Sequence, residues 1–310
     1  MADRELKQVL ISEGLVGERV DSALSKLLGL SRTVIIDLIE VGDVTKKGKR
    51  ITKSQKVELG EHFEVLLPEV KVKGVLTPTP IDNLKVIYDD ADIIVVDKPV
   101  GVAAHASPGW EGPTVIGAII AAGYEINTSG VAERQGIVQR LDVGTSGLMV
   151  VAKNEFSYSA MKDQFRNRLV KKTYHAMIQG HMDPSEGTID APLDRHPRDD
   201  YKFAVTSGGK PSITHYRSIE FFPAVSLLEI ELETGRTHQI RVHFSALRHP
   251  LVGDLIYGAD HTLAKRLEIT RPWLHACNLE FKHPRTGSLL SFASKYPADL
   301  TRTLEILRNS

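Results

Sequence analysis

The chain has 310 residues, of which 42% are hydrophobic and 25% charged, and its 39 basic residues balance its 39 acidic ones. This composition is ordinary for a globular protein with a sizeable core, and the zero net charge gives no sign of a nucleic-acid partner. The single cysteine excludes an intrachain disulfide, and the longest apolar run is too short to span a bilayer. Because charges at the N-terminus do not fit a signal peptide, we expect a cytoplasmic protein without a membrane segment.

The first region, residues 17–67, is compact and follows an N-terminal extension of residues 1–16. Apolar residues at helical spacing predict two helices, through Val20, Leu24, Leu27 and Leu28 and then Ile35, Leu38 and Ile39. Ser31 is the expected N-cap of the second helix, and Gly29 and Gly42 are the expected helix ends. Short strands are expected at 43–44, 57–59 and 63–67. A domain of about fifty residues suits a binding module better than an active site.

Two basic clusters carry local charge despite the neutral total. The first, inside this small region, comprises Lys46, Lys47, Lys49, Arg50, Lys53 and Lys56. The second comprises Lys162, Arg166, Arg168, Lys171 and Lys172. Phosphate binding depends on such patches, but a run of charge more often marks a solvated face. On charge alone both interpretations stay open.

Residues 68–84 have the composition of a linker, with three prolines and a glycine in PEVKVKGVLTPTPID. The region from 85 to 310 is richer in strand-like runs than in helical ones. The clearest strands are predicted at 86–88, 93–96, 149–152, 172–178 and 227–233. Because strands come in adjacent runs, we expect an α+β domain with a mixed, mostly antiparallel central sheet and flanking helices.

Two local patterns indicate where candidate site residues lie. Alternation along 172–178 places Tyr174 on the face of Ala176 and Ile178, so its side chain is expected to point inward. After Arg236 the apolar pattern becomes helical, and Thr237 is the expected N-cap of that helix.

The segment VQRLDVGTSGLMVV, residues 138–151, places Asp142 beside Arg140 between two apolar runs. By residue type this is either a structural ion pair or an ionised carboxylate that acts as a nucleophile or base. Ser146 lacks the G-x-S-x-G spacing of a hydrolase nucleophile elbow. The histidine spacings do not fit a metal site, so we expect no metal.

The same segment resembles the signature of the RluA-type pseudouridine synthases, H-R-L-D-x-x-T-S-G-L-x-x-x-A-K. Further segments resemble family motifs in the family's order: 97–101 (DKPVG), 171–176 (KKTYHA), 234–243 (TGRTHQIRVH), 249–257 (HPLVGDLIY) and 274–281 (LHACNLEF). The small region resembles an S4 RNA-binding domain in Ser31–Arg32, 39–44 and the basic loop. One residue departs from the signature: Gln139 replaces the histidine before Arg140, and an amide cannot carry a charge.

The resemblance implies that a uridine in RNA is isomerised to pseudouridine without a cofactor or metal. It implies Asp142 as the catalytic carboxylate, Arg241 as its ion-pair partner and Tyr174 as the ring beneath the base. Arg140 would fill the space that the flipped uridine leaves. The other residues expected to contact substrate or RNA are Gln139, Thr145, Arg236, His238 and Leu274 in the catalytic domain, and Arg32, Lys46, Lys47, Lys49 and Arg50 in the S4-like domain.

The subgroup with an S4 domain modifies large-subunit (23S) ribosomal RNA, so this RNA is the expected substrate and partner of an expected monomer. Two alternatives stay open. One is a synthase that acts on transfer RNA, and the other is a non-catalytic RNA-binding ribosome assembly factor, for which Gln139 is the support. A hydrolase that uses Ser146 would instead be active without RNA.

Overall fold

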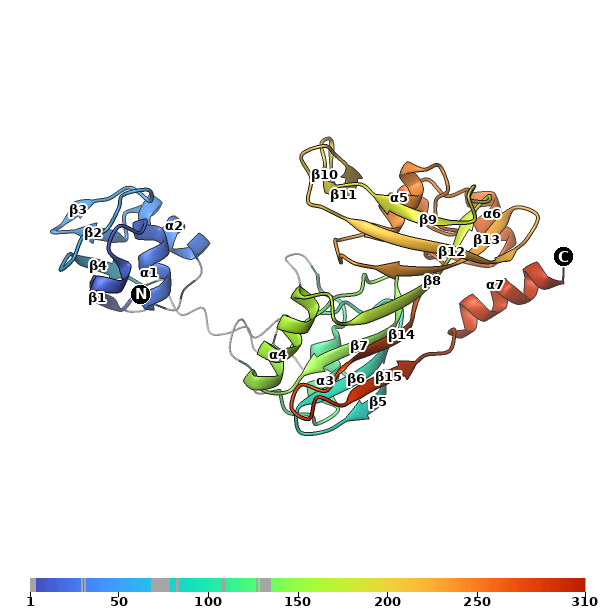
Figure 1. The fold of residues 1–310 in the computed structure, drawn as a ribbon, viewed down its shortest axis with the longest axis horizontal. Coiled ribbons are helices and arrows are strands. Elements are labelled where there is room, and N and C mark those ends of the chain that lie inside the picture. The colour runs from blue at the N-terminus through green and yellow to red at the C-terminus, as the bar shows by residue number, and fades with distance from the viewer. Residues whose placement is uncertain are drawn as a thin grey trace. The chain divides into compact units, whose positions relative to one another are not determined.

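The protein is described here by a computed structural model, which covers residues 4–28, 30, 32–67, 79–81, 84–106, 110–126, 128 and 135–309. The chain divides into two compact units, Met1–Val75 and Leu76–Ser310 (Figure 1). The division falls inside the segment interpreted as a linker. Ser31 and Gly29, expected at helix ends, lie outside the described residues.

The smaller unit packs two helices, α1 (Val20–Leu28) and α2 (Arg32–Val41), against a sheet with strand order β1-β4-β2-β3. The strands are β1 (Leu6–Leu10), β2 (Val44–Lys46), β3 (Lys49–Arg50) and β4 (His62–Leu66), and a 3-10 turn, η1 (Glu13–Leu15), follows β1. The helices bury most of the apolar residues that their spacing predicted, including Leu24, Ile35 and Leu38, but Leu27 is 41% exposed. Gly42 ends α2 with φ 91°, a conformation that glycine adopts without strain.

This unit differs from our expectations in two places. Strand β1 pairs with β4, so residues 6–10 belong to the domain rather than to an extension before it. Residues 57–59 form no strand, and β2 and β3 instead make a hairpin inside the basic cluster. The hairpin was missed because its sequence, KKGKR, has no apolar alternation to mark a half-buried strand. Its turn is made by Lys47 and Gly48, both at positive φ.

The larger unit is built on a sheet with strand order β5-β6-β7-β14-β8-β13-β12-β9, with β15 paired to β14 (Figure 1). In chain order the strands are β5 (Lys85–Asp89), β6 (Ile93–Lys98), β7 (Ser146–Ala152), β8 (Lys171–Gln179), β9 (Glu186–Asp190), β12 (Ile213–Phe221), β13 (Val225–Leu232), β14 (Leu274–Lys282) and β15 (Leu289–Ala293). Strand pairs are antiparallel except for β7 with β14. This mixed sheet confirms the expected α+β fold class.

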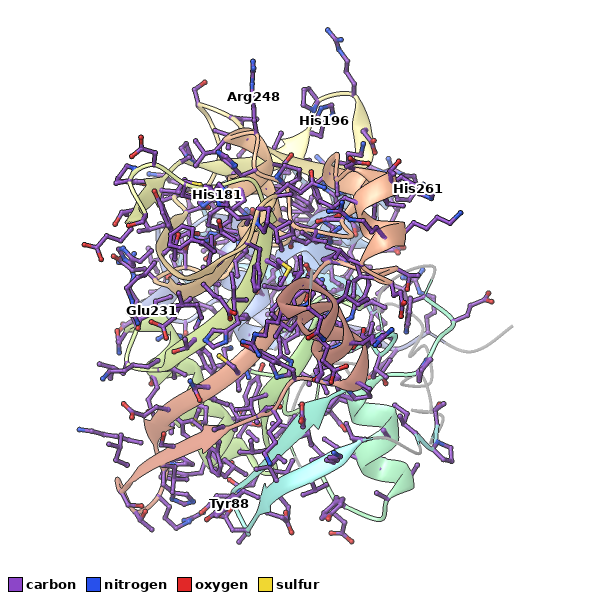
Figure 2. All side chains as sticks on the ribbon, turned by 90° about the vertical axis from the view of Figure 1, so that its right-hand side faces the viewer. Tyr88, His181, His196, Glu231, Arg248 and His261 are labelled. Carbon is purple, nitrogen blue, oxygen red and sulfur yellow. The ribbon has the colours of Figure 1, made fainter. Side chains whose placement is uncertain are left out.

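A separate hairpin and several helices complete this unit. The hairpin pairs β10 (Leu193–His196) with β11 (Asp199–Val205). The helices are α3 (Val115–Ala121), α4 (Glu155–Arg166), α5 (Gln239–Ala246), α6 (His261–Arg266) and α7 (Ala298–Arg308), with a 3-10 turn, η3 (Leu255–Tyr257). His196 on β10 and Tyr88 on β5 lie at opposite ends of the unit (Figure 2). None of the described helices is long and apolar enough to cross a membrane.

Apolar residues cover both faces of the sheet. Along β7, Met149 and Val151 belong to one core cluster, whereas Leu148 and Val150 belong to another. Tyr174 lies in the first cluster with Ala176 and Ile178, as the alternation predicted, and residues of α5 join the same cluster. The side chain of Tyr174 therefore points to the face of the sheet that α5 covers.

Glycine is required where β7 begins. Gly147 has φ 117°, and a Cβ added there would lie 2.3 Å from the carbonyl oxygen of Ala276 on β14. Any side chain would push the two parallel strands apart at the end of the loop that carries Asp142.

We therefore predict that Gly147→Ala destabilises the larger unit by about 4 kcal/mol, because the cost of positive φ adds to a backbone overlap. Gly287→Ala is the control, since Gly287 has φ 70° but open space around it; it should cost only about 1 kcal/mol. Urea unfolding followed by tryptophan fluorescence measures both, because both tryptophans belong to this unit. Equal costs would mean that the approach of Ala276 is not the constraint.

Candidate active site

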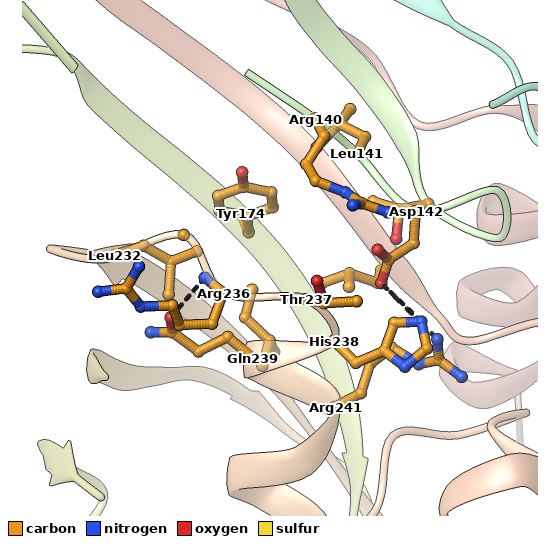
Figure 3. Close-up of a pocket in the computed structure, with 14 residues that line it drawn as sticks. Arg140, Leu141, Asp142, Tyr174, Leu232, Arg236, Thr237, His238, Gln239 and Arg241 are labelled. Carbon is orange, nitrogen blue, oxygen red and sulfur yellow. Dashed lines mark hydrogen bonds and ion pairs between the residues drawn. The ribbon is translucent and has the colours of Figure 1, made fainter. Parts of the chain in front are cut away.

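A pocket on the α5 side of the sheet brings together residues from distant parts of the chain (Figure 3). Its walls come from the loop before β7, from β8, from the loop between β13 and α5, and from the start of β14. The candidate residues that line it are Arg140, Asp142, Thr145, Tyr174, Arg236, His238, Arg241 and Leu274. Gln139 lines an adjoining pocket instead.

The carboxylate of Asp142 faces two cationic or polar side chains from the start of α5. Oδ2 is 3.6 Å from Nη1 of Arg241 and 3.8 Å from Nε2 of His238 (Figure 3). Both separations are longer than a direct hydrogen bond, so the carboxylate keeps its lone pairs available to a ligand in the pocket. Its side chain is only 17% exposed, which limits access to the side that opens into the pocket.

The loop that carries Asp142 is hydrogen-bonded to the 97–101 segment. The backbone N–H of Gly101 donates to the carbonyl of Val143 at 2.9 Å. The fully buried Lys98 donates from Nζ to the carbonyls of Pro99 and Val102 at 3.0 and 2.8 Å. Burial lowers the pKa of Lys98 to about 7, against the opposing charge of Asp142. The segment that resembles DKPxG thus stabilises the backbone beside the carboxylate.

Arg241 is held mainly by a residue that the sequence analysis missed. Its Nε and Nη2 donate to the two oxygens of Asp254 at 2.6 and 2.8 Å, and its guanidinium lies over the ring of Tyr257 at 4.8 Å. The side chain of Asp254 is 1% exposed. This two-pronged contact uses one edge of the guanidinium and leaves Nη1 directed at Asp142. The signal was an acid inside the apolar segment HPLVGDLIY.

The start of α5 differs from the expected N-cap at Thr237. His238 is the N-cap residue, with φ 57°, and its side chain does not cap the helix. The physical reason is Gln239, whose Oε1 accepts hydrogen bonds from the N–H of Arg236 and the hydroxyl of Thr234. These bonds fold the turn tightly, and His238 is forced into a left-handed conformation that non-glycine residues rarely adopt.

Hydrogen bonds also orient the ring of His238. The hydroxyl of Tyr257 accepts the N–H of Phe203 at 3.0 Å and lies 2.8 Å from Nδ1 of His238. Nδ1 is the acceptor in reach of the single hydroxyl proton of Tyr257, so we infer that the hydroxyl donates to Nδ1, which places the ring proton on Nε2, toward Asp142. Burial lowers the pKa of His238, so the ring is neutral at pH 7.

Tyr174 forms the opposite side of the pocket from Asp142 (Figure 3). It is 7% exposed and packs in the core cluster that also holds Leu274. Burial raises the pKa of the Tyr174 hydroxyl well above its usual value, and the charge of Asp142 adds to the shift. The phenol therefore stays protonated at neutral pH, while its ring face offers a flat apolar surface.

The candidate RNA-binding residues of the smaller unit have different surroundings. Arg32 donates to Asp21 at 2.8 Å, and Lys46 pairs with Glu61. The remaining candidates on the β2–β3 hairpin, Lys47, Lys49 and Arg50, are exposed. The hairpin therefore presents three cations to solvent.

Similarity to known proteins assigns the family. Residues 92–246 match the family described as RNA pseudouridylate synthase. The chain belongs to this family. An uncharacterized RNA pseudouridine synthase of Mycobacterium bovis is 55% identical over 308 residues, which cover 99% of each chain. Ribosomal large subunit pseudouridine synthase D of Xanthomonas campestris is 37% identical over 99% of this chain and 94% of its own.

A solved structure agrees with this assignment. Human RNA pseudouridylate synthase domain containing 1 has a TM-score of 0.56 and 29% identity, and the match covers 71% of this chain and 86% of the human chain. The protein is thus an RNA pseudouridine synthase, an enzyme of the isomerase class, and the pocket that holds Asp142 is its candidate active site.

A chain of hydrogen bonds explains Ser146 without hydrolase chemistry. Ser146 bonds Nδ1 of His275 at 2.9 Å, Nε2 of His275 bonds Ser294 at 3.1 Å, and Ser294 donates to Asp97 at 2.7 Å. Burial lowers the pKa of His275 to about 4, which makes it a weak base. Ser146 shares its face of β7 with Leu148, away from Asp142. The chain of bonds joins the ends of β6, β7 and β14.

Within the described part of the chain, one group of side chains has the spacing of a metal site: Asp90, Asp92 and His283. Its ligand atoms already have protein partners. Arg285 donates twice to Asp92, and Asp90 accepts from His283 and Tyr88. The group lies outside the pocket of Asp142.

We predict that Asp254→Asn lowers kcat at least tenfold, because Arg241 loses the contact that directs Nη1 toward Asp142. It should also destabilise the protein by roughly 3 kcal/mol, since a buried guanidinium is left without its main counter-charge. Asp92→Asn is the matched control: it also removes a buried carboxylate from a two-pronged arginine pair, but away from the pocket. Its kcat should equal that of the wild type. Equal kcat values for the two variants would contradict a role for Asp254 in positioning Arg241.

Proposed function

We propose that this synthase isomerises a uridine of 23S ribosomal RNA, with Asp142 as the catalytic carboxylate. The observation that carries the proposal is the convergence of Asp142, Arg241 and Tyr174 on one pocket. The ribosomal substrate is supported by similarity over nearly the whole chain to a protein named ribosomal large subunit pseudouridine synthase D.

The reaction breaks the bond between N1 of uracil and C1′ of the ribose and forms a bond between C5 and C1′. The base departs with the bonding pair on N1, turns in the pocket, and attacks C1′ through C5. C5 then loses its proton and N1 gains one. Asp142 acts at the sugar, either by attacking C1′ or by removing a proton at C2′. Arg241 and the N–H of His238 stabilise its negative charge.

Tyr174 holds the detached base by its ring face and takes part in transferring the C5 proton. Since its hydroxyl is protonated at neutral pH, it can receive that proton only as it passes its own to solvent or to another acceptor. Leu274 and the apolar lining exclude water, which would otherwise capture the sugar. Arg140 is exposed at the pocket and can replace the flipped uridine in the RNA stack.

The smaller unit would act as an S4-like RNA-binding domain. Its support is the sequence resemblance and the exposed cations of the β2–β3 hairpin, Lys47, Lys49 and Arg50. Arg32 and Lys46, which have acidic partners in the free protein, would exchange them for phosphate.

The first test is tritium release from RNA labelled at C5 of uridine. Wild-type protein should release tritium from large-subunit ribosomal RNA but not from transfer RNA, and Asp142→Asn should reduce release by at least about 10³-fold, as expected for loss of a catalytic group. Release from transfer RNA alone would replace the proposed substrate. No release from either RNA, with binding intact, would favour a non-catalytic assembly factor.

A second test separates binding from chemistry. Deleting residues 1–70 should weaken affinity for ribosomal RNA at least tenfold through the loss of several phosphate contacts, while kcat on a saturating short substrate changes less than about twofold. Filter binding and single-turnover kinetics measure the two quantities. Equal losses in both would argue against a separable RNA-binding unit.

A further inference from the structure

A second, larger pocket adjoins the one that holds Asp142. Its volume is about 650 Å³, and it shares Arg140, Tyr174 and Arg236 with the first pocket. Helix α4, strand β8 and the segment before Arg140 supply its other walls. We refer to this second pocket as the side groove. Because Tyr174 lines both, a chain bound at the active site can continue directly into the side groove.

The side groove is strongly cationic. Its positively charged lining residues are Arg140, Arg166, Arg168, Lys172 and Arg236, and the acidic residue among its described lining is Glu233. Glu233 pairs with Arg168 and with His215, so its charge is already compensated. Arg166 pairs with Asp163, which lies outside the groove lining, so Arg140, Lys172 and Arg236 are left without an acidic partner among the described residues.

Lys172 is the cation whose surroundings point most directly to a ligand. It precedes Tyr174 by two residues on β8, so both side chains lie on the same face of the sheet. Nζ lies 5.7 Å from the centre of the Phe165 ring, and no described carboxylate pairs with it. Burial lowers the pKa of Lys172, and no opposing charge offsets that effect. An ammonium group that is largely desolvated and unpaired is unfavourable, so it gains from an anionic ligand.

A second donor in the side groove also lacks a partner. Nε2 of Gln139 is buried and has no hydrogen-bond partner among the described residues. Gln139 and Lys172 line the same groove, together with the rings of Tyr158 and Phe165. The groove thus offers a cation, a neutral donor and aromatic rings, which match the phosphate, the polar edges and the flat bases of single-stranded RNA.

We propose that the side groove binds the nucleotide next to the target uridine, with Lys172 contacting its phosphate and Gln139 donating to its base or ribose. This assignment rests on the proposed function, since it places a neighbouring nucleotide beside a uridine in the active site. It gives Gln139, the residue that departs from the family signature, a role in binding rather than in loss of activity.

Neighbouring lysines provide a matched pair for the test. Lys171 precedes Lys172, but its side chain is 79% exposed and pairs with Glu280 at 3.3 Å. Successive residues of a strand point to opposite faces, so Lys171 faces away from the side groove. Lys171→Met and Lys172→Met therefore remove the same charge from adjacent positions, and only the second removes it from the groove.

The experiment measures kcat/KM for tritium release from unmodified large-subunit ribosomal RNA over a range of salt concentrations, together with thermal unfolding. Lys172→Met should lower kcat/KM about tenfold, as for one lost charge-assisted contact. It should also reduce the slope of log kcat/KM against log salt by about 0.7, as for one lost phosphate contact on a single strand. Its Tm should stay equal or rise, because an unpaired, partly buried charge has been removed. Lys171→Met should match the wild type in all three quantities.

Two further variants separate charge from hydrogen bonding. Lys172→Arg should restore the salt slope, and Gln139→Leu should lower kcat/KM severalfold with the slope unchanged, because an amide carries no charge. A lower Tm with an unchanged slope for Lys172→Met would show a structural lysine and overturn the proposal, as would equal effects of the two lysine variants. Wild-type activity for Gln139→Leu would overturn the role of Gln139. Absence of tritium release by the wild type would instead overturn the proposed function, and this inference with it.

Discussion

The arrangement of the active site depends on how Arg241 is divided between two carboxylates. Asp254 takes two donors of the guanidinium at hydrogen-bond distance, and Asp142 receives the third group at 3.6 Å. If Asp142 alone bound the arginine, a short ion pair would occupy the oxygens that, in the proposed mechanism, act at the ribose. The buried Asp254 therefore lets Arg241 stabilise the charge of Asp142 without blocking it.

The backbone also fixes the position of Asp142, because its loop is held at two places. The sheet fixes one end of its loop, because the close approach of β7 and β14 admits only glycine at position 147. The 97–101 segment holds the other side through the bond between Gly101 and Val143. A carboxylate on a loop can thus be positioned almost as rigidly as one on a strand, which favours catalysis by orientation.

Sequence periodicity predicted those parts of the fold that local burial determines. The alternation around Tyr174, five of the strands of the central sheet and the α+β class all follow from patterns of two or 3.6 residues. The β2–β3 hairpin and the true start of α5 could not be found in this way. The first lacks apolar residues, and the second depends on bonds from the side chain of Gln239 to Arg236 and Thr234. Asp254 was also missed, because its role depends on a contact with Arg241, thirteen residues earlier in the chain, that no local spacing reveals.

Hydrogen-bond satisfaction distinguishes the structural polar groups of this protein from those proposed to bind RNA. The chain from Ser146 through His275 and Ser294 to Asp97 has the composition of a catalytic relay, yet each link has its partner within the protein. Such a closed network gains nothing from a ligand. Lys172 and Gln139 differ from that network. Each is partly buried, yet the described residues supply no anion to Lys172 and no hydrogen-bond acceptor to Nε2 of Gln139. In the proposed complex, RNA supplies phosphate and base acceptors there, so the free energy lost in the free protein is recovered on binding.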